Sequence, residues 1–179
     1  MSDTDILGTE RFLTFTLAQE LFAITITSVR EILDMAEITR IPQMPPAVRG
    51  VVNVRGMAVP VIDLRLRFGL EAVERTVNTR IIIVEFRVGD STTILGAIAD
   101  SVKEVLELDT TSIDPPPAMG TAVNTAFLRG IGKRDGKFIL LLNIEKVLHS
   151  DEVYMLGEVS RSLNDGSPLP GSAESGQTQ

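Results

Sequence analysis

Apolar and polar residues alternate along much of the chain with a period of two. Leu13, Phe15 and Leu17 alternate with Thr14 and Thr16, and residues 22–27 continue with Phe22, Ile24 and Ile26 alternating with Thr25 and Thr27. This period places successive side chains on opposite faces of a strand, and β-branched residues favour strands. We therefore predict a half-buried hairpin that turns at residues 18–20, and a second one over residues 82–98 that turns at residues 89–90.

Two further hairpins are indicated by turn residues between apolar runs. Residues 51–64 contain an Arg-Gly turn at 55–56, and Pro60 in the return strand marks an edge or a bulge. The Asp-Gly pair at 135–136 is a strong hairpin signal, and a nearly pure apolar strand follows it over 138–144. Short strands spaced by turns, without long amphipathic helices, predict small β-barrels.

The second half of the chain repeats the first. Residues 28–33 (Ser-Val-Arg-Glu-Ile-Leu) return at 101–106 (Ser-Val-Lys-Glu-Val-Leu), a shift of 73 (101 − 28). Residues 48–51 return at 128–131, a shift of 80 (128 − 48), so the second copy contains a seven-residue insertion. A repeat of two predicts a tandem pair of similar modules and not a solenoid, which needs three or more units. Such a pair suits a connector better than an enzyme.

The repeat and the local composition divide the chain. We predict a first β-barrel module over residues 11–79 and a second over 80–148, with strands exchanged between them. Helical spacing of apolar residues predicts a C-terminal helix over 149–163. Residues 1–10 and the Gly-, Ser- and Pro-rich residues 164–179 are expected to be flexible tails.

Composition narrows the class of protein. A hydrophobic fraction of 44% in 179 residues allows a sizeable core. The net charge of −7 argues against nucleic acid and against docking on an anionic membrane. The absence of Cys and the presence of one His leave almost no ligands for disulfides or transition metals. No stretch resembles a signal peptide or reaches the ~18 apolar residues that span a bilayer. We expect a cytoplasmic protein without metal or cofactor and without direct membrane insertion.

Three sequence motifs resemble parts of catalytic sites, but each has a better explanation that does not involve catalysis. The His-Ser-Asp run at 149–151 is contiguous, so it cannot align a catalytic triad. The glycine-rich run at 130–137 misses the phosphate-loop spacing by one residue, and Phe138 stands where Ser or Thr would bind magnesium. The repeat-related Glu31 and Glu104 each sit between a cationic and an apolar neighbour. Such a residue belongs either to a solvated strand edge or to a docking surface.

One stretch is specific enough to indicate a family. It resembles the Asn-Leu-Arg-Gly … Val-Pro-Ile-(Val/Ile)-Asp-Leu-Arg signature of CheW-type chemotaxis coupling proteins, and it reads Asn53-Val54-Arg55-Gly56-Met57-Ala58-Val59-Pro60-Val61-Ile62-Asp63-Leu64-Arg65. The likeness runs from about Arg11 to Tyr154. It includes the strand at 12–17 and the stretches 29–32, 39–42, 99–102 and 143–148.

The resemblance implies a fold and a function. The fold is all-β, two intertwined five-stranded SH3-like β-barrels, in agreement with the duplication. Members of this family have no known catalytic activity. They link the cytoplasmic hairpin tip of methyl-accepting chemoreceptors to the regulatory domain of the histidine kinase CheA, and rings of the two tie receptors into arrays. We expect this chain to be such an adaptor, recruited to receptor arrays and able to meet other coupling proteins in rings.

The resemblance also implies two binding surfaces. An apolar groove with a charged pair would receive the receptor hairpin, and it would be lined by Val29, Glu31, Ile32, Val54, Arg55, Gly56, Val102 and Val105. The kinase surface would include Asp114, Met119 on a Pro-rich loop, and the open edge of the first module. Two departures from the family pattern concern single contacts. Arg80 opens a strand where an apolar residue is expected, and Asp114 stands where a basic residue often sits.

Two alternatives remain open at this stage. The chain could be the coupling module of a CheV-type protein or the regulatory domain of a CheA-like kinase, although it lacks a phosphotransfer helix, an ATP-binding domain and an acidic receiver pocket. It could also be a small β-barrel enzyme that uses Glu31, Asp63 and Arg55. A deep polar cleft uniting those three residues would favour the enzyme, and a shallow apolar groove would favour docking.

Overall fold

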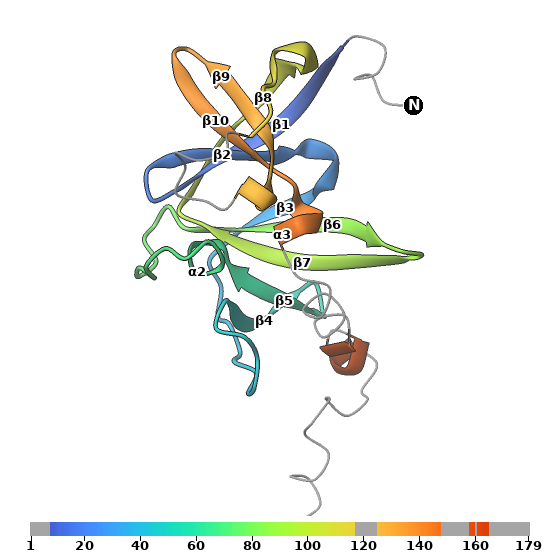
Figure 1. Cartoon of the computed structure of the whole chain (residues 1–179). Coiled ribbons are helices and arrows are strands. Elements are labelled where there is room, and N and C mark those ends of the chain that lie inside the picture. Colours follow the sequence, from blue (N-terminus) through green and yellow to red (C-terminus); the bar gives the residue numbers. More distant parts are fainter. Residues whose placement is uncertain (1–7, 117–124, 148–157, 160, 165–179) are drawn as a thin grey trace, which may run out of the picture.

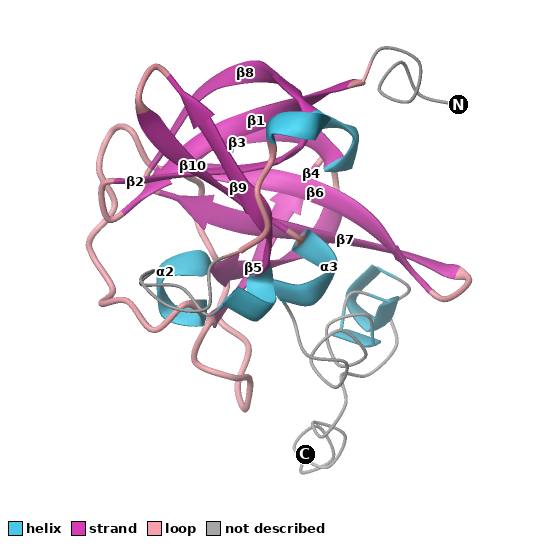
Figure 2. Cartoon of the chain, turned by 45° about the horizontal axis from the view of Figure 1, so that its top comes forward, coloured by secondary structure: helices cyan, strands magenta, loops and turns pink. Residues whose placement is uncertain are grey.

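The structure is a computed structural model, and it describes residues 8–116, 125–147, 158–159 and 161–164. Ten strands in these ranges form two five-stranded sheets (Figures 1 and 2). The first sheet has the order β8-β1-β2-β10-β9 and contains β1 (Thr9–Leu17), β2 (Glu20–Thr25), β8 (Ser101–Asp109), β9 (Leu128–Arg134) and β10 (Lys137–Leu142). The second has the order β3-β6-β7-β5-β4 and contains β3 (Val29–Asp34), β4 (Val48–Val54), β5 (Met57–Asp63), β6 (Arg80–Val88) and β7 (Ser91–Ala99).

The two sheets have the same plan and exchange strands. In each sheet a hairpin from one half of the chain, β1–β2 or β6–β7, lies between three strands from the other half. Repeat-related strands therefore occupy the same places in the two sheets, which confirms the prediction of two intertwined five-stranded barrels. The predicted boundary between the modules, at residues 79 and 80, separates the two copies of the sequence repeat. Each sheet contains strands from both sides of this boundary.

Each barrel is closed by a short backbone bridge. The segment after β3 returns to β4 through hydrogen bonds in both directions between Thr39 and Val51, each 2.8 Å long. The segment after β8 makes the same bridge between Asp114 and Ile131, at 2.9 and 2.8 Å. The repeated glycines lie beside these bridges, because a Cβ atom on Gly50 would stand 2.0 Å from the Thr39 carbonyl oxygen. Closure of the barrel thus explains why glycine recurs at positions 50 and 130.

The predicted hairpin turns are all present. The β1–β2 and β4–β5 turns place two successive residues at positive φ, Ala18 and Gln19 in one and Arg55 and Gly56 in the other. The same holds for the Asp-Gly turn of β9–β10. This conformation matches the twist of the flanking strands in two-residue hairpins. Pro60 lies just outside the part of β5 that pairs with β7, so the strand is open on that side, as the sequence predicted.

Three apolar clusters hold the fold together. One lies inside each barrel, around Phe12 and Ile139 in the first and around Val61 and Ile81 in the second. The largest cluster draws residues from both sheets. A row of aromatic rings crosses it, with centroids 6.0, 5.9 and 5.3 Å apart, from Phe15 through Phe22 and Phe68 to Phe127. Strands that face both their own barrel and the neighbouring one are buried on both sides, as residues 81–84 are.

The ends of the modules differ from the sequence prediction. β1 begins at Thr9 and not at residue 11, because Thr9 and Glu10 pair with β8. The helical turns α2 (Leu64–Arg67) and α3 (Ile144–Val147) follow the last strand of each copy. Residues 158–159 and 161–164 are helical, whereas much of the predicted helix over 149–163 lies outside the described residues. None of the helices among the described residues is both long and apolar enough to cross a bilayer.

Candidate functional site

The predicted site residues Glu31 and Arg55 come from opposite edges of the second sheet and meet where the barrel closes. Glu31 lies on the edge strand β3, and Arg55 lies in the turn between β4 and β5. The Arg55 Nη2 atom donates to Glu31 Oε1 at 3.1 Å. The Arg55 side chain is 82% exposed and that of Glu31 only 25%. The pair therefore presents a cation to solvent above a half-sheltered carboxylate.

Arg55 occupies an unfavourable backbone conformation. Its φ is 54°, in the left-handed region where Asn, Asp and Gly are common and other residues are strained. The turn is held by the Asn53 side chain, whose Oδ1 accepts the Gly56 N–H at 2.8 Å. The equivalent residue of the first-sheet barrel is Asp135, also at 54° and well suited to the turn. Arginine is therefore present in the second-sheet barrel despite the turn geometry.

Two large apolar residues lie close to this pair in the sequence and are exposed. Ile32 follows Glu31 on β3, on the opposite face of the strand, and Met57 follows Gly56 at the start of β5. Val54 is half-buried against the core of its own barrel, and Val29 packs against the cluster between the barrels. The sequence interpretation missed Met57, although it lies inside the signature stretch and beside the turn.

The structure places the remaining predicted groove residues on the other sheet. Val102 and Val105 lie on β8, which is the repeat equivalent of β3. Val102 pairs with Phe15 and packs against the same central cluster as Val29, whereas Val105 is exposed. The two valines therefore lie on the other sheet from Glu31 and Arg55, and only Val102 shares a packing cluster with the rest of the predicted set, through Val29.

Of the two residues predicted for the kinase surface, the structure describes only Asp114. The backbone of Asp114 makes the bridge that closes the first-sheet barrel, and its side chain is exposed. Met119 lies outside the described residues. Arg80, the unexpected cation at the start of β6, is half-buried and pairs with Asp34 at 3.4 Å across the end of β3.

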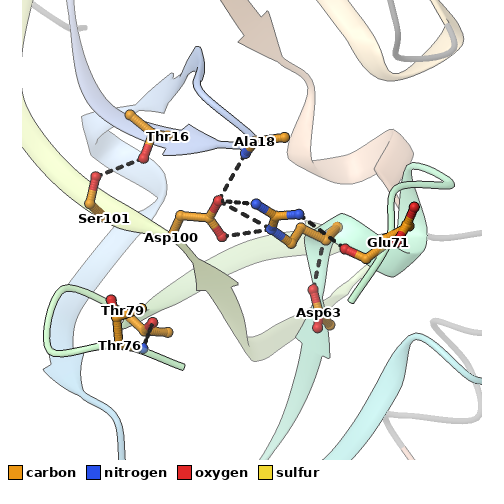
Figure 3. Close-up of polar contacts among 9 residues, drawn as sticks. Thr16, Ala18, Asp63, Glu71, Thr76, Thr79, Asp100 and Ser101 are labelled. Carbon is orange, nitrogen blue, oxygen red and sulfur yellow. Dashed lines mark hydrogen bonds and ion pairs between the residues drawn. The ribbon is translucent and has the colours of Figure 1, made fainter. Parts of the chain in front are cut away.

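A polar network that the sequence analysis did not predict joins the two barrels (Figure 3). The Arg65 guanidinium, on α2, donates to both carboxylate oxygens of Asp100 at 2.7–3.1 Å. Asp100 Oδ2 also accepts the Ala18 N–H at 2.8 Å, and the Asp100 N–H donates to the Thr16 carbonyl at 2.9 Å. Asp100 therefore connects the β1–β2 hairpin of one sheet with the helical turn after the other.

This network makes the stability of the fold depend on pH. Burial alone would raise the pKa of Asp100, but the hydrogen bonds from Arg65 and from the Ala18 N–H outweigh it and hold the pKa below its ordinary value of 3.8. A carboxyl whose pKa is lowered by folding stabilises the fold above its unfolded-state pKa, and this contribution is lost as the pH falls through the folded-state value.

We therefore expect the free energy of unfolding to fall as the pH is lowered from about 5 to about 2. Urea titrations at several pH values should show a shallower fall for Asp100→Asn than for the unmodified chain, because the amide does not titrate. Equal slopes for the two proteins would mean that Asp100 does not contribute to acid unfolding.

The residues of the proposed enzyme do not form one cleft. Asp63 caps α2 by accepting the Arg65 N–H at 2.9 Å, and it pairs with Arg49 at 3.5 Å. The cavity of about 730 Å³ beside Asp63 is lined by neither Glu31 nor Arg55. Among the described residues no group of three or more His, Cys, Asp or Glu side chains is placed to hold a metal ion. The arrangement at Glu31 and Arg55 is a surface suited to docking.

Comparison with known proteins agrees with this geometry. The model of the CheW-like domain matches residues 11–152. The chain is 35% identical over 153 residues to the chemotaxis protein CheW of Klebsiella aerogenes, covering 86% of this chain and 90% of the relative. It is 36% identical over 141 residues to CheW of Helicobacter pylori, covering 79% and 82%.

A solved structure has the same fold. The crystal structure of the scaffolding protein TtCheW from Thermoanaerobacter tengcongensis superposes with a TM-score of 0.72 at 38% identity. The superposition covers 80% of this chain and 90% of that one. Sequence, strand order and structural likeness therefore place this chain in the CheW-like domain family.

Proposed function

We propose that this chain is a non-catalytic scaffold that couples methyl-accepting chemoreceptors to the histidine kinase CheA in chemotaxis. The observation that carries the proposal is the Glu31–Arg55 pair at the edge where the second-sheet barrel closes, with exposed Ile32 and Met57 close by in the sequence. As a coupling protein it would act in the cytoplasm and be recruited to arrays of membrane-bound receptors.

The difference between the two barrels supports a docking role for this pair. The folds of the barrels are repeat-related, and the equivalent turn in the first-sheet barrel carries Asp135, which suits the left-handed conformation. Glu104, the equivalent of Glu31, would face a like charge there. An arginine that costs conformational energy in only one of two equivalent turns points to a function at that turn.

The chemistry of the surface fits a helical hairpin. Such a partner lays aliphatic side chains against an apolar surface, and a charged pair at its edge sets the register. We assign the receptor contact to the whole predicted set, namely Val29, Glu31, Ile32, Val54, Arg55 and Gly56, with Val102 and Val105 from β8.

We assign the contact with the CheA regulatory domain to a separate surface around Asp114 and Met119. The exposed Asp114 side chain stands at the closing bridge of the first-sheet barrel, on a different sheet from Arg55. A separation of the two surfaces would let the chain hold a receptor and a kinase at once, and it would also permit rings with other coupling proteins.

Reversing the charge at Glu31 tests the receptor surface. Glu31→Lys replaces the attraction to Arg55 with repulsion, and we expect receptor binding to weaken by roughly 1–3 kcal/mol while the fold survives. The measurement is co-sedimentation of the protein with receptor-containing membranes, with and without CheA. The matched control is Glu107→Lys, which breaks an exposed ion pair with Arg11 in the other sheet and should leave receptor binding unchanged.

A charge swap separates recognition from stability. The double variant Glu31→Arg with Arg55→Glu restores an ion pair within the chain but presents the opposite charges to a partner. If receptor binding stays weak in the swapped protein, the receptor contacts these two charged side chains directly. Full recovery of binding would show that the pair only supports the fold, and unchanged affinity in folded Glu31→Lys would place the receptor surface elsewhere.

A further inference from the structure

The C-terminal helical segment contacts the strand that carries the receptor-site turn. Asn164 uses its side-chain amide as a backbone mimic. Its Oδ1 accepts the Ala58 N–H at 2.8 Å, and its Nδ2 donates to the Ala58 carbonyl at 3.2 Å. Val159 and Ser162 of the same segment are buried, so the segment is seated on the body of the protein. Figure 1 shows this segment, in red, on the side of the molecule where β4 and β5 lie.

Asn164 binds to β5 at Ala58, which lies beyond the part of the strand that pairs with β7 among the described residues. The parallel pairing of β5 with β7 covers only residues 61–63 and ends before Ala58 is reached. A strand edge left open in this way presents backbone groups that need partners. The Asn164 amide supplies one acceptor and one donor to the same residue, as an adjacent strand would.

Ala58 stands at the base of the Arg55–Gly56 turn. It is paired with Asn53 on β4, and the next pair toward the turn is Val54 with Met57. Asn53 in turn holds the turn by accepting the Gly56 N–H. The contact at Ala58 therefore fixes the strand from which the strained turn projects.

We propose that Asn164 is a positioning residue for the Glu31–Arg55 pair, acting through the backbone of Ala58. The inference rests on the proposed function, because it assigns a part of the receptor site to the C-terminal segment. By holding β5 it keeps Arg55 in the left-handed conformation in which its guanidinium reaches Glu31. Asn164 is thus a structural part of the site and not the first residue of a flexible tail, as its sequence context predicted.

Hydrogen exchange and receptor binding test the proposal together in the full-length protein. In Asn164→Ala we expect faster exchange of the Ala58 and Gly56 amides, with the melting temperature nearly unchanged. Affinity for receptor-containing membranes should fall by roughly two- to tenfold, the ratio expected for the loss of a net hydrogen bond. Asn164→Asp should fall between Asn164→Ala and the unmodified chain, because a carboxylate still accepts the Ala58 N–H but cannot donate to the Ala58 carbonyl.

Two control variants make the outcome specific. Arg161→Ala removes an exposed ion pair with Glu158 inside the same segment, and Asn78→Ala removes an exposed asparagine from a distant loop. Both should leave exchange at the turn and receptor affinity unchanged. Unchanged exchange in Asn164→Ala, or faster exchange with unchanged affinity, overturns the proposal, and so does full tolerance of Asn164→Asp.

The same measurements on Glu31→Lys separate this inference from the proposed function. If Glu31→Lys weakens receptor binding and Asn164→Ala does not, only the positioning role is wrong. If Glu31→Lys itself leaves the affinity unchanged, the receptor surface is wrong and the positioning role falls with it.

Discussion

Replacement of Gly50 by alanine is expected to prevent stable folding. The new Cβ atom would stand 2.0 Å from the Thr39 carbonyl oxygen and 2.7 Å from its carbon. Both atoms belong to the backbone bridge that closes the second-sheet barrel, so neither can move without opening it. We expect a loss of more than about 4 kcal/mol, beyond the usual range for one substitution. The measurement is a urea titration, or the soluble yield where the variant does not fold.

The matched control is Gly69→Ala. Gly69 also has a positive φ, 81°, but a Cβ atom there would meet no atom within 4 Å. Only the conformational strain of alanine applies, which costs about 1 kcal/mol. Gly130→Ala in the second copy would meet the Asp114 carbonyl oxygen at 2.7 Å and should also be severe. Equal losses for Gly50→Ala and Gly69→Ala would show that barrel closure does not depend on the close approach at Gly50.

Loss of the Asp100 carboxylate is the second large effect expected. Asp100→Ala removes the partner of Arg65, whose side chain is only 15% exposed, and leaves the Ala18 N–H without its acceptor. Breaking a largely buried pair from one side strands the remaining charge. We expect the free energy of unfolding to fall by about 3 kcal/mol, measured by urea denaturation at neutral pH.

Asp34→Ala provides the comparison for Asp100→Ala. Asp34 is also paired with an arginine, Arg80 at 3.4 Å, but its side chain is 90% exposed. Exposed pairs contribute little, so the loss should stay below about 1 kcal/mol. If the two aspartates cost the same, the link between the barrels through Asp100 contributes no more than a surface ion pair.

The strands and turns could be predicted because their signals are local. A period of two and paired turn residues lie within a few positions of each other, as in the Asp-Gly hairpin after β9. The family signature also placed Glu31 and Arg55 in one groove. Their direct contact follows only from closure of the barrel, which brings the two edge strands of one sheet together.

The contacts that the sequence did not reveal are all non-local. Asp100 lies within a stretch noted for its likeness to the family, yet its partners Arg65 and Ala18 are distant in the chain. Asn164 sits at the start of a Gly-, Ser- and Pro-rich run, so composition indicated a tail. A side-chain amide that replaces a strand neighbour leaves no periodic signal, and only the position of Ala58 beyond the β7 pairing explains it.

The exchange of strands between the sheets also bears on synthesis at the ribosome. The first hairpin, β1–β2, is translated early, but the strands that pair with it, β8 and β10, are among the last three strands of the described residues. Burial of the hairpin's aromatic side chains therefore requires that almost the whole chain has been synthesised. These side chains are Phe12, Phe15 and Phe22. Pairings between distant residues slow folding, and waiting apolar surface favours aggregation. Nascent chains of this architecture should accordingly depend on holding chaperones until β10 has emerged.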